Sequence, residues 1–292
     1  MTDDSDFAAV RDGLRLQMFD ATELGILDLT MPKDEMPYVQ FVAGELYVGV
    51  RMGDDGPASV AQVEGWGVAF ADALQSALSS TPPLEVDAVQ GVAEITEEEQ
   101  AAAILVDPSR AERLNVEGDL VVTRLAQAHV IVTGADDERG FERALEAAEE
   151  LIRTGTRLAS IHPIGNPGAK WFPFPWRERF PALAERITRV TREFGIRAYA
   201  EQKSALDAGE VRVLEPKLER LDTGVTVTFA TWLSGTAALL PVVDNVIIAS
   251  RQGALGVMGF AEFIEQAGDR VMRTELAPIR YFVSEGLELS AS

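Results

Sequence analysis

Apolar positions in the first third of the chain recur at two spacings, which predict an alternation of helices and strands. Helical spacing over 6–24 predicts a helix whose apolar face carries Phe7, Val10, Leu14 and Met18. Gly44 lies between two alternating runs and predicts a hairpin turn. Alternation predicts strands over 26–31, 37–42, 46–51 and 84–95, the last as a pair or one bent strand, and a second helix is predicted over 59–78.

The middle of the chain has the same kind of pattern. Thr96, followed by Glu99, has the spacing of a capping box and predicts a helix that runs to Val106. Apolar spacing then predicts strands over 120–124, 128–133 and 157–161 and a helix over 141–153. The segment 162–181 holds five prolines and predicts irregular structure.

The last part begins with an arginine-rich helix that is expected to end near Gly195. Further strands are predicted over 196–201, 211–214, 225–233, 242–250, 271–275 and 279–283, with a helix over 258–267. We therefore predict an α+β protein of two or three repeated modules, each an antiparallel sheet with helices packed on one side. The predicted boundaries are 1–106, 107–175 and 176–292. Chance similarity in the order of elements remains the alternative to repetition.

Two parts of the sequence resemble known families. The order α-β-β-β-α-β in the acidic N-terminal part resembles the type III secretion chaperone-like fold, including YbjN-type domains. The run ALLPVVDNVIIAS at 238–250, followed by a helix and APIRYFV at 277–283, resembles the closing part of the YtpQ family of uncharacterised proteins. The chaperone resemblance implies protein binding through an exposed sheet or helix face, usually as a dimer. Those chaperones are much shorter, so a tandem arrangement would be required.

Charge is distributed unevenly and narrows the choice of partners. The chain has 26 basic and 47 acidic residues, a net charge of −21, and residues 1–100 hold 20 acids against 4 bases. Such an excess repels nucleic acid and anionic membranes, so neither is an expected partner. The N-terminus lacks the pattern of a signal peptide, and no apolar run is long enough to span a membrane. A cytoplasmic location is therefore expected.

Residue supply excludes several chemistries. The chain has no cysteine and only two histidines, which rules out thiol catalysis and histidine-rich metal sites. No P-loop, GxSxG or HExxH motif is present, and the glycines at 253–259 are spaced GxxGxxG rather than GxGxxG. We predict no cofactor, no metal and no catalytic constellation. His129 is interpreted as a strand histidine, whereas His162, near Lys170, is the centre of a possible site in an alternative enzymatic hypothesis that also needs a loop carboxylate.

The most distinctive stretch lies inside the proline-rich segment. Aromatic residues beside arginine are typical of protein-binding hot spots, and this stretch carries Trp171, Phe172, Phe174, Trp176 and Arg177. The competing interpretation is that the aromatic residues fill the junction between two modules.

The helix that follows carries Arg186, Arg189 and Arg192 at a spacing that places them on one face. These arginines could bind an anionic ligand or nucleic acid, or could dock against the acidic first third. The leading hypothesis is a non-enzymatic, protein-binding or chaperone-like protein with a protein partner and a possible homodimeric state. Its expected contact surface is the aromatic stretch together with these three arginines.

Overall fold

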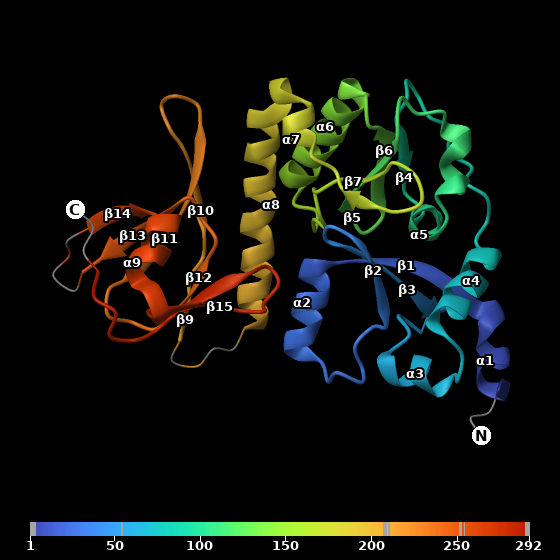
Figure 1. The fold of residues 1–292 in the computed structure, drawn as a ribbon, viewed down its shortest axis with the longest axis horizontal. Coiled ribbons are helices and arrows are strands. Elements are labelled where there is room, and N and C mark those ends of the chain that lie inside the picture. The colour runs from blue at the N-terminus through green and yellow to red at the C-terminus, as the bar shows by residue number, and fades with distance from the viewer. Residues whose placement is uncertain are drawn as a thin grey trace. The chain divides into compact units, whose positions relative to one another are not determined.

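The computed structural model describes residues 4–53, 55–206, 209, 211–250, 253 and 255–289. The chain forms an α+β fold that divides into two compact units, Met1–Val190 and Thr191–Ser292. The ribbon in Figure 1 shows helices and sheets in each unit. The predicted α+β class is therefore confirmed, while repetition of modules stays a hypothesis.

Unit 1 contains two antiparallel sheets. The first has the order β1-β3-β2 and the second β4-β6-β5-β7-β8. Their strands are β1 (Leu14–Asp20), β2 (Val39–Ala43), β3 (Leu46–Met52), β4 (Ala93–Ile95), β5 (Leu120–Ala126), β6 (His129–Gly134), β7 (Ile164–Asn166) and β8 (Phe172–Pro173). The helices are α1 (Asp4–Val10), α2 (Ala21–Thr30), α3 (Val60–Gly65), α4 (Phe70–Ser80), α5 (Glu98–Val106), α6 (Glu138–Thr154) and α7 (Trp176–Arg179), with 3-10 turns η1 (Arg11–Gly13), η2 (Pro108–Leu114) and η3 (Pro181–Leu183).

One hydrophobic core joins the two sheets of unit 1. It includes Leu16 and Val48 from the first sheet and Val132 and Ile164 from the second. The helix α5 contacts β1 and β3 as well as β4. Its residues 101–105 are all buried, and the three alanines among them allow close approach of neighbouring strands. The core thus crosses the predicted boundary between 1–106 and 107–175.

A buried ion pair also links the two sheets. Arg124 on β5 lies 3.5 Å from Asp20 at the end of β1, and both side chains are 1% exposed. Asp20 is also the N-cap of α2, since its Oδ1 accepts a hydrogen bond from the backbone N–H of Glu23 at 2.8 Å. Glu98 of α5 lies on the other side of the Arg124 guanidinium at 3.8 Å. This packing fixes β1, α2 and α5 around β5.

Unit 2 contains two four-stranded sheets, with orders β10-β11-β13-β14 and β15-β16-β12-β9. Two strand pairs, β11 with β13 and β12 with β9, are parallel. The elements are β9 (Arg212–Val213), β10 (Lys217–Arg220), β11 (Thr226–Leu233), β12 (Ala238–Pro241), β13 (Asn245–Ala249), β14 (Leu255–Gly259), α9 (Phe260–Ala267), η4 (Gly268–Arg270), β15 (Val271–Arg273) and β16 (Arg280–Val283). The long helix α8 (Ala184–Ala205) runs through the division between the units.

The core of unit 2 forms around Trp232, whose ring packs edge-on against Phe263 with centroids 5.4 Å apart. Arg280 is fully buried beside this core. Its guanidinium donates hydrogen bonds to Oε1 of Gln202 and to the backbone oxygens of Leu214 and Tyr199. Burial lowers the pKa of Arg280 to about 10, because the influence of the nearby Tyr199 and Glu215 only partly offsets the lost hydration.

Several predicted elements differ from the structure near the N-terminus. Residues 14–20, predicted as helix, form the strand β1, and 26–31, predicted as a strand, lies largely in α2. The helix predicted over 59–78 is interrupted at Gly67, which has a φ of +68°. Only 93–95 of the strand region 84–95 pairs in a sheet. The capping box at Thr96 is wrong, since Glu97 is the N-cap of α5 and forms no side-chain cap bond.

Later differences lie on either side of the proline-rich segment. Residues 196–201, predicted as a strand, continue α8, and 157–161 forms no strand but makes two backbone hydrogen bonds to the end of β5. Within the glycine stretch 253–259, residues 255–259 form the strand β14, and Ala254 lies outside the described residues. The strands β10 and β12 were not predicted.

Candidate functional site

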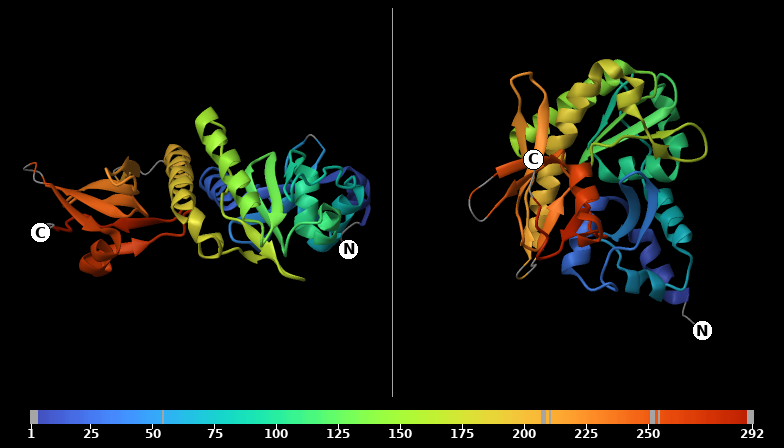
Figure 2. Two further views of the ribbon diagram at one scale, coloured as in Figure 1. Left: turned by 90° about the horizontal axis from the view of Figure 1, so that it is seen from above. Right: turned by 60° about the vertical axis from the view of Figure 1, so that its left-hand side comes forward.

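The proline-rich segment 162–181 contains a β-hairpin. β7 pairs antiparallel with β5 and β8 pairs with β7, in the register Ile164 with Pro173 and Gly165 with Phe172. A Cβ on Gly165 would lie 3.2 Å from the Phe174 ring, so glycine permits this close approach. The yellow-green hairpin lies at the periphery of its unit in both views of Figure 2. We call residues 164–173 the β7–β8 hairpin.

Two of the aromatic residues that follow the hairpin's edge pack inward. Trp176 is 4% exposed, with its ring 6.1 Å from that of Phe141 on α6. Phe174 stacks on the same Phe141 ring at 5.2 Å, and Phe180 packs beside both. Truncation of a buried aromatic side chain such as that of Trp176 costs about 3–5 kcal/mol, whereas Phe174 is only partly buried. Trp176 and Phe174 therefore contribute to packing within unit 1.

Of the other predicted site residues in the segment, Lys170, Trp171 and Phe172 lie on the hairpin itself. Trp171 is half-buried, and its indole N–H donates a hydrogen bond to the Leu105 backbone oxygen at 3.0 Å. Phe172 is 53% exposed and Lys170 is exposed. Arg177 is exposed on α7. The hairpin thus presents a cation and two aromatic residues on the surface of unit 1.

The arginines of α8 are held by carboxylates of the same chain. Arg186 donates two hydrogen bonds to Glu149 of α6, at 2.9 and 2.6 Å, and Arg189 donates a third at 2.5 Å. The hydrogen bonds from Arg186, with those from Arg189, hold the pKa of Glu149 below its ordinary value against the effect of burial. Arg186 binds Glu149 in a bidentate arrangement, the stronger form of an arginine–carboxylate pair.

Arg192 is engaged inside unit 2. It donates a hydrogen bond to Asp244 at 2.7 Å and another to the Thr226 backbone oxygen. Burial raises the pKa of Asp244, but hydrogen bonds from Thr228 and Arg192 outweigh it and leave the pKa below its ordinary value. Glu149 and Asp244, which bind the three arginines, both lie outside the acidic first third.

The two histidines lie apart from each other in unit 1. His162 is exposed, and its backbone N–H donates a hydrogen bond to Ser160 Oγ at 3.2 Å. It does not line any of the hollows described below. His129 is a strand residue on β6, as predicted, and its Nε2 lies 3.0 Å from Glu94. His129 and Glu94 line an open hollow of about 560 Å³ between β6 and α6.

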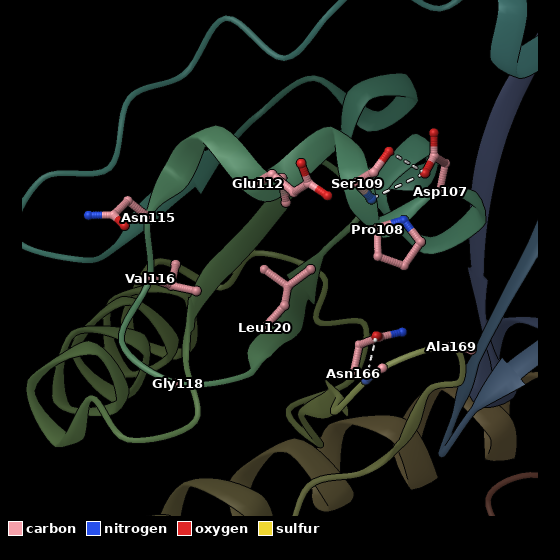
Figure 3. Close-up of a pocket in the computed structure, with 12 residues that line it drawn as sticks. Asp107, Pro108, Ser109, Glu112, Asn115, Val116, Gly118, Leu120, Asn166 and Ala169 are labelled. Atoms are coloured by element: carbon pink, nitrogen blue, oxygen red, sulfur yellow. Dashed lines mark hydrogen bonds between the residues drawn. The ribbon is translucent and has the colours of Figure 1, made fainter.

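A hollow of about 600 Å³ lies between η2 and the loop of the β7–β8 hairpin, and we call it the η2 hollow (Figure 3). A 3-10 turn repeats every three residues, so its positions sort into faces. Ser109, Glu112 and Asn115, each three residues apart, share one face and line the hollow. Ala111 and Leu114 are buried in the core.

The third face of η2 carries two arginines that fasten the turn to the preceding segment. Arg110 donates hydrogen bonds to the backbone oxygens of Leu78 and Thr81, at 2.8 and 3.0 Å. Arg113 binds the Leu84 backbone oxygen at 2.5 Å and Asp87 at 2.6 Å. Both guanidinium groups are therefore occupied away from the hollow, which leaves carboxylates on its rim.

Asn166 provides a polar group at the floor of the η2 hollow. The residue is 8% exposed, and its Oδ1 accepts a hydrogen bond from the Gly168 backbone N–H at 3.2 Å. Its Nδ2 is buried and has no hydrogen-bond partner in the described part of the chain. Figure 3 shows this side chain extending from the hairpin toward η2. A buried donor without an acceptor is costly, so an acceptor that entered the hollow would be stabilised.

Two smaller hollows share walls with the η2 hollow along the same hairpin. The first, which we call the Trp171 groove, has a volume of about 310 Å³ and shares Pro108 and Ala169 with it. The edge strand β2 forms the other wall of this groove, where Phe41 is 58% exposed. The second, the proline pocket, has a volume of about 180 Å³ and shares Asn166 with the η2 hollow.

The proline pocket is mostly apolar. Its walls include Pro167, Pro173 and Pro175 together with the rings of Phe172 and Phe174. Such a pocket beside one polar group is typical of ligand and peptide sites, in which apolar walls supply affinity and few polar groups fix orientation. The hairpin therefore contributes to three hollows at once.

Sequence reasoning identified Lys170, Trp171, Phe172 and Phe174 but missed Asn166, Glu112 and the turn η2. The available signal was the dipeptide Asp107-Pro108, in which Asp107 caps η2 by accepting from Ser109 and proline occupies the first turn. Nothing in the local sequence indicated that this turn lies opposite the hairpin.

No group of three or more potential metal ligands comes together among the described residues. In the same part of the chain, no helix combines the length and apolar character needed to cross a bilayer. No protein-family model matches the sequence, and no curated protein or solved structure matches it either. The resemblances to chaperone-like domains and to the YtpQ family thus stay hypotheses.

Proposed function

We propose that this protein binds other proteins, in a non-enzymatic or chaperone-like role, by receiving an extended segment of a partner along the β7–β8 hairpin. The observation that carries the proposal is Asn166, which lines both the η2 hollow and the proline pocket and whose buried Nδ2 has no acceptor among the described residues. A main-chain carbonyl of an extended peptide is a suitable acceptor, because extended segments leave their backbone groups available.

The surroundings of Asn166 support a peptide rather than a compact small molecule. Three hollows follow one hairpin, and adjacent hollows share wall residues, so the concave surface is longer than any one of them. Phe172 and Phe41 are exposed large apolar residues on its borders. Aromatic residues at the rim of a groove are frequent anchors in protein interfaces.

The proposal is tested by selecting random short peptides on the immobilised protein and measuring each against variants. Asn166→Leu removes the free donor, and selected peptides should bind about fivefold to tenfold more weakly, the weight of one buried hydrogen bond. Phe172→Ser removes an exposed ring, so the fold is retained, and binding should weaken about tenfold. Gln75→Leu, an exposed amide on α4, is the control and should bind normally.

The proposal fails if no peptide is enriched, or if the enriched peptides bind Phe172→Ser and Asn166→Leu as tightly as they bind the control. Circular dichroism and thermal unfolding confirm that each variant is folded. Phe172→Ser keeps the test decisive if Asn166→Leu disturbs the hairpin loop.

A further inference from the structure

The walls around Asn166 carry acidic side chains and no basic ones among the residues described. The η2 hollow is lined by Asp107 and Glu112, and the proline pocket by Asp119. No lysine, arginine or histidine in the described part of the chain lines either space. A ligand that bridged these two spaces would therefore pass three carboxylates.

These carboxylates are not neutralised by the arginines nearest in sequence. Arg110 and Arg113 instead bind the 78–87 segment, where they donate hydrogen bonds to backbone oxygens and to Asp87. Asp107 uses Oδ1 to accept from both the backbone N–H and the hydroxyl of Ser109, at 3.1 and 2.6 Å. Glu112 is exposed, and its backbone oxygen accepts a hydrogen bond from the Asn115 N–H, whereas no hydrogen bond or ion pair to its carboxylate is found among the described residues.

The proline pocket adds a requirement for an apolar group. Its volume of about 180 Å³ is several times the roughly 30 Å³ that one water molecule occupies in the liquid. Its walls are proline and phenylalanine side chains with few polar atoms, so they offer bound water few hydrogen bonds. An aliphatic or aromatic side chain would bury apolar surface there without leaving polar groups unsatisfied.

We infer that the partner segment is basic and apolar: it is extended, carries a lysine or arginine that lies against Glu112 and Asp107, and places one apolar side chain in the proline pocket. Asn166, which lines both spaces, donates its free N–H to a main-chain carbonyl between these two side chains. This inference rests on the proposed function and specifies its partner.

The charge of the whole chain favours the same class of ligand. A net charge of −21 attracts cationic segments at long range and repels acidic ones. Lys170 lies in the Trp171 groove, beyond the η2 hollow, and is the single basic side chain that lines that groove among the described residues. An acidic residue in the segment could therefore be accepted next to Lys170, but the acidic walls beside Asn166 require the basic one.

The test is a charge swap on the peptides selected above. The variant Glu112→Lys should bind the basic peptides about fivefold more weakly than the unmodified protein does. The same variant should recover affinity for peptides in which the basic residue is replaced by glutamate. Glu64→Lys, an exposed glutamate on α3, is the matched control and should change neither series. Replacing the apolar peptide residue by glycine should weaken binding about tenfold.

The two proposals fail in different ways. If the selected peptides depend on Asn166 and Phe172 but lack basic residues, or ignore Glu112→Lys, the inference is overturned and the proposed function stands. Enrichment of acidic peptides whose binding depends on Lys170 would also overturn the inference and leave the proposed function standing. If no peptide depends on Asn166 and Phe172, the proposed function itself is overturned.

Discussion

Asp20 is an ionisable residue whose environment in unit 1 opposes its charge. Burial raises the pKa of Asp20 to about 6, and the neighbouring Arg124 and the hydrogen bond from the Glu23 backbone only partly counter that effect. Burial likewise raises the pKa of Glu98, against the influence of Arg124. The Arg124 guanidinium thus lies close to carboxylates that have lost much of their hydration, between the two sheets of unit 1.

Asp20 should make the stability of unit 1 depend on pH. Its pKa in the folded state, about 6, exceeds the ordinary value of 3.8. Between these values the folded state binds more protons, so the free energy of unfolding falls as pH rises, by up to about 3 kcal/mol from this group. Asp20→Asn keeps an Oδ1 for the cap and removes the ionisation. The stability of the native protein relative to this variant should therefore decline from about pH 4 to pH 7.

Urea unfolding followed by tryptophan fluorescence measures this difference, since three of the four tryptophans, at 66, 171 and 176, lie in unit 1. Asp72→Asn, at an exposed position of α4, is the control. Parallel stability curves for the native protein and Asp20→Asn would mean that Asp20 ionises normally in the folded state.

Local sequence predicted part of the candidate site, because the run of aromatic residues beside basic ones singled out Trp171 and Phe172, with Lys170 next to them. Asn166 could not be found this way. Its significance depends on burial beneath η2, a turn about fifty residues earlier in the chain, and on Gly168 occupying one side of its amide. Both facts are tertiary, so no local pattern contains them.

At the scale of elements, the sequence predicted best where one periodicity dominated. The β5–β6 pair and α6 lie where the alternation and the helical spacing indicated. Residues 14–20 satisfied both spacings at once: Leu14, Leu16 and Met18 alternate as a strand, while Leu14 and Met18 also fit a helix. Pairing with β3 along seven residues decided the outcome.

The β7–β8 hairpin escaped prediction because proline is read as a breaker of regular structure. Pro173 lies on β8, at the edge of the sheet order β4-β6-β5-β7-β8, where a missing N–H does not interrupt a ladder to a further strand. The same prolines discourage additional strands from pairing with this edge. They also form the walls of the proline pocket, so the edge is apolar but not open to sheet extension.

Substitution of Gly195 tests whether α8 is continuous. The helix passes through this residue, and a Cβ built there meets no atom within 4 Å. Gly195→Ala should therefore stabilise unit 2 by about 0.5–1 kcal/mol through helix propensity. Thermal unfolding followed by hydrogen exchange or by the fluorescence of Trp232 should have a higher midpoint in this variant than in the native protein.

Gly134→Ala supplies the opposite control, because its Cβ would lie 1.9 Å from the Glu117 backbone oxygen and must destabilise unit 1. If Gly195→Ala lowered the midpoint, the helix would end at Gly195, as the sequence pattern suggested, and the structural description of α8 would be wrong.

At the scale of the whole molecule, charge and architecture point the same way. The arginines that looked available in the sequence are largely committed: Arg186 and Arg189 to Glu149, and Arg192 to Asp244. These ion pairs contain both signs of charge, so they do not change the formal net charge of the chain, which is −21. Among the hollows described, those beside Asn166 combine acidic rims with an apolar pocket, which suits a basic and apolar protein segment.

The most direct test of the central claim is to locate a selected peptide by nuclear Overhauser contacts on isotope-labelled protein. The account predicts contacts from the peptide to the side-chain amide of Asn166 and the ring of Phe172, together with a shift of the Asn166 N–H signal on binding. Residues of α8 around Arg186 and Arg189 should show no contacts, since Glu149 already holds them. Contacts along α8 with none to Asn166 would contradict the account.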